Sequence, residues 1–277
     1  MRIAYPGSAG SYTEEAAARL FPDAERIAVG DFEAVAHAIT SGDVDRAVLA
    51  IENSLAGLVP DTLSILERGQ LSIVAEAVLH IPHCLVAVPG TRLEEVRVVH
   101  SHPMALAQCR ALLTAYERVG ASTTADAARH VAQLGDRSVA AVASPLAARE
   151  NGLEVLLDDV SDHPENLTRF AALARHMTLV KDVDGPWSTT LRMITGHDPG
   201  ALHAAIEPFR YHRVNMTSLQ SRPIMGEPWR YQFYVEIDGH RNDEKVLRAL
   251  RDVGDRAAFL ETLGSYPVWR DPSQGPV

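Results

Sequence analysis

The regular alternation of strand-like and helix-like segments through the first 180 residues restricts the fold of this chain more than any other feature. Apolar strand-like runs occur at 2–5, 47–51 and 139–143. Between such runs, apolar residues recur at helical spacing, as they do after Asp31, with Gly42 as a stop signal. This succession is typical of a parallel or mixed sheet covered by helices. We therefore expect an α/β region.

Two chain crossings divide this region into two lobes. Extended runs lie at 71–79 and 83–88, and we interpret the change near His80 as a crossover into a second lobe. Strands at 153–157 and 167–173 then return the chain to the first lobe. We expect the two lobes to face each other across a cleft.

The domain boundaries follow from these crossings. The two-lobed region should occupy 1–181, with lobe 1 at about 1–79 and 154–181 and lobe 2 at about 80–153. No internal repeat or low-complexity segment interrupts it.

The C-terminal part has a different pattern. Residues 181–186 mix Gly and Pro with polar residues and predict a linker. From 187 to 272 the signals follow the order β-α-β-β-α-β, with Asp198-Pro199-Gly200 opening the first helix. This order indicates a small α+β module of the ferredoxin-like or regulatory type.

Composition narrows the classes of partner. The formal net charge is -10 with the twelve histidines neutral, which argues against a nonspecific nucleic-acid surface. An anionic small substrate stays compatible with this charge, provided that arginines or helix N-termini surround it. No apolar run reaches membrane-spanning length, so we expect neither export nor membrane insertion. Cys84 and Cys109 cannot form a disulfide framework, which favours a reducing cytoplasm.

Polar residues follow two of the expected strands. Gly7-Ser8-Ala9-Gly10 forms a turn, and Ser11-Tyr12-Thr13-Glu14 has capping-box spacing before a helix. Such a turn can receive an anion, although many α/β turns of this kind bind no ligand. Glu52-Asn53-Ser54 stands at the C-terminal end of a strand, where open α/β sheets bind ligands. These residues can equally form a polar turn that caps the next helix.

Two histidines begin a further helix. His100-Ser101-His102-Pro103 precedes a helix that we expect to run to about Arg118, with Pro103 suited to the first helical position. Histidines at i and i+2 without a nearby carboxylate are poorly spaced for a metal, so we expect no metal site.

Polar residues also interrupt an apolar strand at Asn166-Leu167-Thr168-Arg169-Phe170. The plainest interpretation is a strand with one polar face. In an extended strand Thr168 and Phe170 share one face, while Arg169 points the opposite way.

Four motifs in this order resemble those of the monofunctional prephenate dehydratases that carry a C-terminal ACT domain. They are Gly7 through Tyr12 before Glu15-Ala16-Ala17, then Ile51-Glu52-Asn53-Ser54, then Ser101-His102-Pro103 with Gln108-Cys109, and finally Asn166 through Phe170. In the C-terminal part, Gly200-Ala201-Leu202 resembles the start of the first ACT helix, and Gln220-Ser221-Arg222-Pro223 resembles the phenylalanine-binding loop. Each motif is weak alone, but their common order extends the resemblance over nearly the whole chain.

Four positions depart from the family pattern. Ser8 stands where proline is common and Met104 where glutamine is common. Gln220 replaces the usual glutamate and His203 the usual valine. The last two lie in the C-terminal part, so the resemblance bears more strongly on catalysis than on regulation.

The resemblance implies a two-lobed, periplasmic-binding-protein-like catalytic region with its active site in the cleft, followed by an α+β ACT domain. It implies conversion of prephenate to phenylpyruvate in phenylalanine biosynthesis. It also implies a homo-oligomer, a dimer or a tetramer, inhibited by phenylalanine at the ACT interface. Because the reaction expels carbon dioxide and hydroxide and gains an aromatic ring, it needs no redox cofactor and no metal.

Thr168 carries the central chemistry in this resemblance, with its hydroxyl placed as a preorganised hydrogen-bond donor to the leaving oxygen. The candidate substrate-binding residues are Gly10, Ser11, Asn53, Ser54, His102, Arg169 and Phe170. Arg169 either contacts a carboxylate or forms an interlobe salt bridge, and Phe170 is expected to pack. His102 is a proton donor or, as we prefer, a helix cap. Glu52 would repel a dianionic ligand unless it is protonated or turned away.

The implied effector site lies in the C-terminal part. Gly200, Ala201 and Leu202 would present helix amides and an apolar border to an amino acid. The opposing loop of a neighbouring subunit would consist of Gln220, Ser221, Arg222 and Pro223.

Three alternatives remain open. An arogenate dehydratase would use the same cleft on a substrate with an amine in place of the ketone. A non-aromatising prephenate decarboxylase would keep the ring hydroxyl, which the presence of Thr168 disfavours. A non-catalytic amino-acid sensor would lack the polar cleft residues, whereas Asn53, Ser54 and Thr168 are present.

Overall fold

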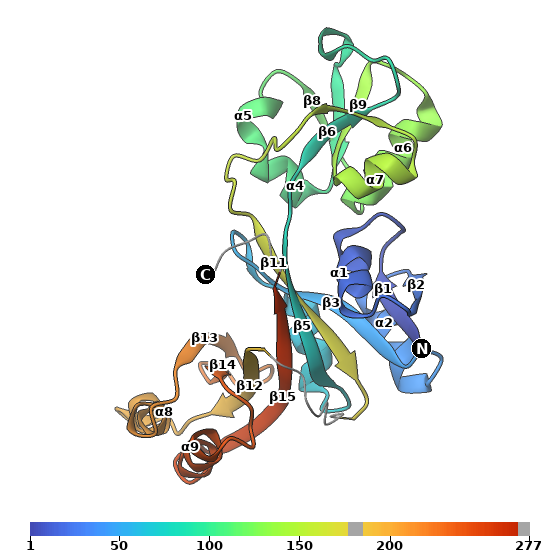
Figure 1. The fold of residues 1–277 in the computed structure, drawn as a ribbon. Helices are drawn as coiled ribbons and strands as arrows, with labels where there is room; N and C mark the ends of the chain where they lie inside the picture. The colour runs from blue at the N-terminus through green and yellow to red at the C-terminus, as the bar shows by residue number, and fades with distance from the viewer. Residues whose placement is uncertain (177–184, 271–277) are drawn as a thin grey trace. The chain divides into compact units, whose positions relative to one another are not determined.

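A computed structural model describes residues 1–176 and 185–270, so the linker expected at 181–186 lies largely outside the described residues (Figure 1). The chain forms two compact units. Unit 1 contains Met1–Ile65 and Ala77–Ala171 together with Arg270, and unit 2 contains Leu66–Glu76 and Ala172–Trp269. Unit 2 thus combines the C-terminal part with an internal segment.

The first sheet of unit 1 places β1 between β2 and β3. These three strands are parallel, and Ile3 pairs with Arg26 on one side and Arg46 on the other. Strand β11 lies beside β3, and β4 pairs with β3 from the opposite direction. The elements of this part are β1 (Arg2–Pro6), α1 (Tyr12–Leu20), β2 (Glu25–Val29), α2 (Phe32–Ser41), β3 (Arg46–Asn53), β4 (Gly57–Leu58), α3 (Pro60–Glu67) and β11 (Leu167–Ala174).

The second sheet of unit 1 has the strand order β10-β6-β9-β7-β8. Its central strand β9 is fully buried and consists of Ala and Val, whose small side chains let helices approach closely. The elements are β6 (Cys84–Ala87), η1 (Leu93–Glu95), β7 (Val98–Ser101), α4 (Pro103–Gln108), α5 (Arg110–Leu113), β8 (Glu117–Gly120), α6 (Thr124–Leu134), β9 (Val139–Ala143), α7 (Pro145–Glu150) and β10 (Glu154–Leu157). Two sheets within unit 1 confirm the expected α/β class.

The prediction of one long helix from Pro103 to about Arg118 is wrong. Helix α4 ends at Gln108, and the chain restarts as α5 because the Asp162 carboxylate accepts the backbone N–H groups of Arg110 and Ala111 at 2.8 and 3.0 Å. Residues 117–120 then form β8, which pairs in parallel with β7. A distant carboxylate and a neighbouring strand override the local helical pattern.

The strand expected at 153–157 does not return to the first sheet. It forms β10, which pairs antiparallel with β6 through Val155 and Val86. The chain therefore returns to the first sheet after β10, in the segment that precedes Asn166.

Strand β2 was not predicted from the sequence, because its residues show no apolar alternation and its burial is slight.

Unit 2 has the predicted β-α-β-β-α-β order. Its strands are antiparallel neighbours in the order β13-β14-β12-β15, and both helices pack on one face through a shared apolar core. The elements are β12 (Trp187–Ile194), α8 (Ala201–Tyr211), β13 (Met216–Pro223), β14 (Tyr231–Asp238), α9 (Glu244–Gly254) and β15 (Phe259–Arg270). Strand β15 is longer than the expected 259–263 because it stays paired with β12 as far as Pro267.

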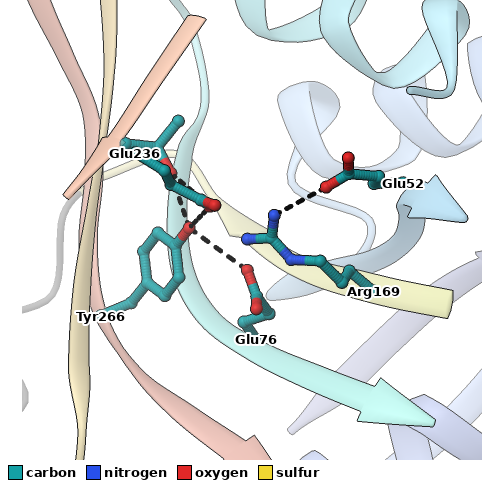
Figure 2. Close-up of polar contacts among 6 residues, drawn as sticks. Glu52, Glu76, Arg169, Glu236 and Tyr266 are labelled. Atoms are coloured by element: carbon teal, nitrogen blue, oxygen red, sulfur yellow. Dashed lines mark hydrogen bonds and ion pairs between the residues drawn. The ribbon is translucent and has the colours of Figure 1, made fainter. Parts of the chain in front are cut away.

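A buried polar cluster fixes the internal segment of unit 2. Strand β5 (Ser72–His80) follows β15 in the sheet order, and Glu76 lies on it. The Tyr266 hydroxyl lies 3.3 Å from Glu76, 3.1 Å from Glu236 and 2.6 Å from the Thr190 hydroxyl (Figure 2). Because these four side chains are buried, their mutual hydrogen bonds offset the cost of removing them from water.

None of the helices within 1–176 and 185–270 is both long and apolar enough to cross a membrane.

Candidate active site

The side-chain amide of Asn53 lies at the centre of the polar residues that the sequence singles out. Asn53 is the last residue of β3, and its Oδ1 accepts the backbone N–H groups of Leu55 and Ala56 at 3.1 and 3.0 Å. Its Nδ2 therefore faces the start of β11 and the residue before it. It donates to Asn166 Oδ1 at 2.7 Å and to Thr168 Oγ1 at 2.9 Å, and it also lies 3.1 Å from the Leu167 carbonyl oxygen. The amide is fully engaged within the protein.

Thr168 is buried, with 8% of its surface exposed. Its Oγ1 accepts the hydrogen bond from Asn53, and no second protein partner for Oγ1 occurs within the described residues. A threonine hydroxyl has one hydrogen to donate. That hydrogen is therefore available to a bound molecule.

Ser54 joins the end of β3 to the start of β11. Its Oγ donates to the carbonyl oxygen of Glu165 at 3.1 Å and accepts the N–H of Leu167 at 3.0 Å. Its own N–H donates to the Leu167 carbonyl oxygen at 2.8 Å. Both donor groups of Ser54 are occupied, so this residue holds the strand that carries Thr168.

Arg169 forms an ion pair with Glu52, with 2.8 Å between Nη1 and Oε2 (Figure 2). Both side chains are mostly buried. Arg169 thus forms a salt bridge, but not the interlobe one that was expected, because Glu52 on β3 and Arg169 on β11 lie on neighbouring strands of one sheet. Phe170 is 2% exposed and packs in the core, as expected.

The turn before α1 makes contact with the second sheet's helix α7. The Ser144 hydroxyl donates to the Gly10 carbonyl oxygen at 3.0 Å, and a Cβ at Gly10 would lie 3.0 Å from the Ala147 Cα. The Gly10 N–H donates to Glu14 Oε2 at 2.8 Å, so this amide serves the protein instead of an anion. Ser11 caps α1 by accepting the N–H of Glu14 at 3.2 Å.

His102 is the N-cap of α4. Its Nδ1 accepts the N–H of Met104 at 3.2 Å, and its surface is exposed. Partial burial of the ring lowers its pKa, which weakens its capacity to hold a proton near neutral pH. The geometry agrees with the capping role that we preferred.

Two further residues belong to this polar group and were not among the predicted site residues. Asn166 is 1% exposed, and its Nδ2 donates to Gln108 Oε1 at 3.2 Å. Gln108 is the last residue of α4, so it links the second sheet's helix to the strand that carries Thr168. Both residues lie inside the motifs already quoted. An uncharged amide within an apolar run was the signal in the sequence that could have identified them as site residues.

A cavity of about 560 Å³ lies elsewhere in unit 1, between α1, α7 and the crossover at residues 79–82. It is lined by Tyr12, Arg19, His80, Leu146, Arg149 and neighbouring residues, and neither Asn53 nor Thr168 borders it. The candidate active site therefore rests on the hydrogen-bond geometry around Thr168 and not on this cavity.

The expected effector residues all lie in unit 2. Gly200 caps α8 with a left-handed φ of 83°, and Ala201 and Leu202 form the first turn. Residues 220–223 lie in strand β13 and not in a loop, because each pairs with a residue of β14. Arg222 forms an ion pair with Glu67 at 3.0 Å.

Glu67 also accepts hydrogen bonds from Gln232 Nε2 at 2.9 Å and from the Tyr234 hydroxyl. Burial and the neighbouring Glu67 carboxylate raise the Tyr234 pKa, so this phenol stays protonated as a donor. Arg222 is thereby held in a defined position in unit 2.

Within residues 1–176 and 185–270, no three His, Cys, Asp or Glu side chains are grouped so that they could hold a metal ion.

The fold and the site define an α/β protein with a buried hydroxyl, oriented by a side-chain amide, and a separate β-α-β-β-α-β unit. A family model described as prephenate dehydratase matches residues 3–178. The chain belongs to the prephenate dehydratase family.

Two similar proteins carry names of this family, and a third carries a different description. The chain is 38% identical over 279 residues to arogenate dehydratase/prephenate dehydratase 2, chloroplastic, of Arabidopsis thaliana. This alignment covers 97% of this chain and 73% of the relative. The structure of prephenate dehydratase from Arthrobacter aurescens in complex with L-Phe is 30% identical, with a TM-score of 0.86 over 100% of this chain and 92% of that one. The structure of GqqA, described as a novel type of quorum quenching acylase, is 35% identical with a TM-score of 0.87 over 99% of both chains.

Proposed function

We propose that this chain catalyses the decarboxylating dehydration of prephenate to phenylpyruvate, a carbon–oxygen lyase reaction. The bond between the ring and its carboxylate breaks, carbon dioxide leaves, and the electron pair enters the ring. The ring carbon–oxygen bond breaks at the same time, and the hydroxyl leaves as hydroxide, which becomes water on protonation. Aromatisation drives the reaction, so the enzyme must chiefly orient the substrate and stabilise charge at the leaving oxygen.

The hydroxyl of Thr168 is the observation that carries this proposal. Asn53 donates to Oγ1, which leaves the Thr168 hydrogen directed to other acceptors. A threonine hydroxyl is too weak an acid to transfer its proton completely, but a fixed donor in a buried site stabilises developing negative charge. Thr168 therefore acts as the donor to the leaving hydroxide.

The neighbouring residues divide between positioning and substrate contact. Asn53 and Ser54 position Thr168, because their own donors are occupied within the protein. Arg169 neutralises Glu52, which removes a negative charge that would repel a dianionic substrate. Ser11, at the N-terminus of α1, is the remaining polar side chain proposed to meet a substrate carboxylate, with favourable helix amides beside it.

An assay with two substrates tests the proposal. Purified protein is supplied with prephenate and, separately, with arogenate, and the products are identified by mass and absorbance. Phenylpyruvate from prephenate supports the proposal, phenylalanine from arogenate alone would assign the other dehydratase activity, and no turnover of either would reject both.

A substitution at Thr168 tests the role of the hydroxyl. Thr168→Val keeps the shape of the side chain and removes the donor, so we expect kcat to fall by about 100- to 1,000-fold. Thr168→Ser keeps a hydroxyl and serves as the matched control, with a much smaller loss. Comparable rates for the valine variant and the unmodified protein would remove Thr168 from the mechanism.

An acylase activity has less support from this site. A hydroxyl that attacks an acyl group needs an adjacent base to take its proton. In the described chain Thr168 Oγ1 accepts from an amide, and no imidazole or carboxylate forms a hydrogen bond with it. The hydroxyl is arranged as a donor and not as an activated nucleophile.

We further propose that unit 2 is an ACT domain through which phenylalanine inhibits a cytoplasmic homo-oligomer. The β-α-β-β-α-β order, the α8 N-terminus at Gly200 and the relative bound to L-Phe support this proposal. The effector must bind one conformation more tightly than the other. Calorimetry should detect phenylalanine binding, and its absence, with turnover unchanged at millimolar phenylalanine, would reject the regulatory role.

A further inference from the structure

The direction of the hydrogen bonds around Thr168 can be followed across unit 1 from two backbone amides. The N–H groups of Leu55 and Ala56 can only donate, so the atom of Asn53 that they contact is the carbonyl oxygen Oδ1. The other end of the amide is then Nδ2, a donor. It donates to Thr168 Oγ1 and also to Asn166, whose contacting atom must be Oδ1.

The same reasoning extends from Asn166 to the second sheet's helix. With Oδ1 of Asn166 facing Asn53, its Nδ2 faces Gln108 at 3.2 Å. Gln108 must therefore present Oε1, because two donors would repel each other. The orientation of three side-chain amides is thus set by backbone groups at residues 55 and 56.

The last residue in this series of hydrogen bonds is His83, which lies between β5 and β6 at the first crossover. Its Nε2 is 3.0 Å from Gln108 Oε1. A carbonyl oxygen only accepts hydrogen bonds, so the hydrogen of the imidazole must be on Nε2. His83 is 2% exposed, and its Nδ1 is buried with no hydrogen-bond partner among the described residues.

The surroundings of His83 keep the ring in place. The ring of Tyr12 packs edge-on against it with 6.2 Å between centroids, and the Tyr12 hydroxyl donates to the carbonyl oxygen of Pro82. A hydrogen on Nδ1 would be an unsatisfied buried donor, which costs more than leaving a lone pair there. Burial also lowers the His83 pKa, which favours the neutral ring.

We propose that His83 is a positioning residue of the active site: its Nε2–H donates to Gln108 at the end of the hydrogen-bond series opposite the backbone N–H groups of residues 55 and 56. It thereby helps to hold Asn166 and Asn53 in the orientation that directs the Thr168 hydroxyl. The proposal rests on the function proposed above for Thr168. His83 does not touch the substrate. Gln108 would join the two crossovers of unit 1, since it accepts from His83 on the first and from Asn166 beside the second.

A spectroscopic measurement tests the hydrogen-bond direction independently of activity. Long-range proton–nitrogen correlation spectra distinguish the two neutral imidazole tautomers, and the His83 signals are assigned by their loss in His83→Gln. We expect the neutral form with hydrogen on Nε2 at pH 7.5. Hydrogen on Nδ1, or a charged ring at that pH, would overturn the proposal even if the protein turns over prephenate normally.

Kinetic measurements test whether this orientation reaches Thr168. His83→Met removes the donor at similar length, and we expect kcat to fall about five- to tenfold with little change in KM. His83→Gln places an amide N–H near the position of Nε2 and should recover most of the lost rate. A shared loss in both variants would contradict a role for the donor.

A double-mutant cycle separates positioning from a general structural effect. In a Thr168→Val background the hydroxyl is absent, so His83→Met should lower the residual rate by less than about twofold. An equal loss in both backgrounds would overturn the proposal. Leu113→Ala, in the core beneath the second sheet, is the control for lost stability, and it should change the rate by the same factor with and without the Thr168 hydroxyl.

The two proposals can fail separately. If the unmodified protein fails to convert prephenate, the proposed function is rejected, and the tautomer measurement still tests the direction of the hydrogen bonds from His83 to Thr168.

Discussion

At the scale of single residues, the hydrogen bonds of the Asn53 side-chain amide indicate that this residue positions Thr168 and does not bind the substrate. Its oxygen accepts two backbone N–H groups, and its Nδ2 donates toward Asn166 Oδ1, Thr168 Oγ1 and the Leu167 carbonyl oxygen. An amide with every bond satisfied inside the protein gains nothing from a substrate carboxylate. Its contribution to the reaction is the orientation that it gives to a neighbouring hydroxyl.

Replacing the Asn53 amide by a carboxylate of the same shape should reverse the direction in which the Thr168 hydroxyl donates its hydrogen. In Asn53→Asp the atom facing Thr168 becomes an acceptor, so the Thr168 hydrogen turns toward it and is lost to the substrate. We expect kcat to fall by at least about 100-fold, as after loss of the donor itself. Steady-state kinetics with prephenate provide the measurement.

The matched control for this substitution is Asn151→Asp. The Asn151 amide donates to the Ala147 carbonyl oxygen at 2.8 Å near the end of α7, and its side chain makes no contact with Thr168. It should lose a little stability and keep its turnover. A similar loss of kcat in the two variants would show that the effect at Asn53 is not specific.

At the scale of elements, the helices that begin with a local cap were predictable and those arranged by distant residues were not. Ser11 and Asp31 cap α1 and α2 through residues three positions later, which is a pattern visible in the sequence. The restart at α5 depends on Asp162, about fifty residues away. No local signal could have revealed that cap.

The candidate site shows the same limit. Asn53 and Ser54 were candidates because open α/β sheets bind ligands at the carboxyl ends of their strands, and the family resemblance added Thr168 to them. Which atom of each side chain donates depends on contacts between segments more than a hundred residues apart. The direction of the Thr168 hydroxyl therefore required the structure.

The turn before α1 offers a test of the close approach between two elements. Gly10 has a left-handed φ of 83°, and a Cβ there would be 3.0 Å from the Ala147 backbone of α7. Gly57 has a nearly identical φ of 81° but nothing within 4 Å of that position. Alanine at either site meets the same backbone strain of about 1 kcal/mol, and only Gly10→Ala adds a steric clash.

We expect Gly10→Ala to lower the free energy of unfolding by about 1–3 kcal/mol more than Gly57→Ala does. Urea denaturation of the two variants, analysed with a common m-value, measures the difference. Equal destabilisation would mean that the turn and α7 separate easily. In that case the contact between them would contribute little to the stability of unit 1.

At the scale of the whole molecule, the homo-oligomer proposed above needs a contact surface, and we expect one at the open strand edge of unit 2. Strand β13 pairs only with β14 among the described strands, so it is an edge with free backbone groups. The turn that joins these strands exposes Met225 and Trp229, at 93% and 81% of their surfaces. Trp229 also has a positive φ of 63°, which is unfavourable for a bulky side chain.

The expected homo-oligomer therefore leads to a prediction in which stability and association change in opposite directions. Trp229→Gly relieves the backbone strain, so the isolated chain should unfold at an equal or higher urea concentration. The same change removes a large aromatic side chain from the expected contact, and loss of a hot-spot aromatic weakens association by about 30-fold or more. Sedimentation velocity over a concentration series measures the association. Tyr211→Ser removes an aromatic that is similarly exposed on α8 and is the control. Sedimentation of Trp229→Gly like the unmodified chain would exclude this turn from the contact, because the oligomer would then form through another surface.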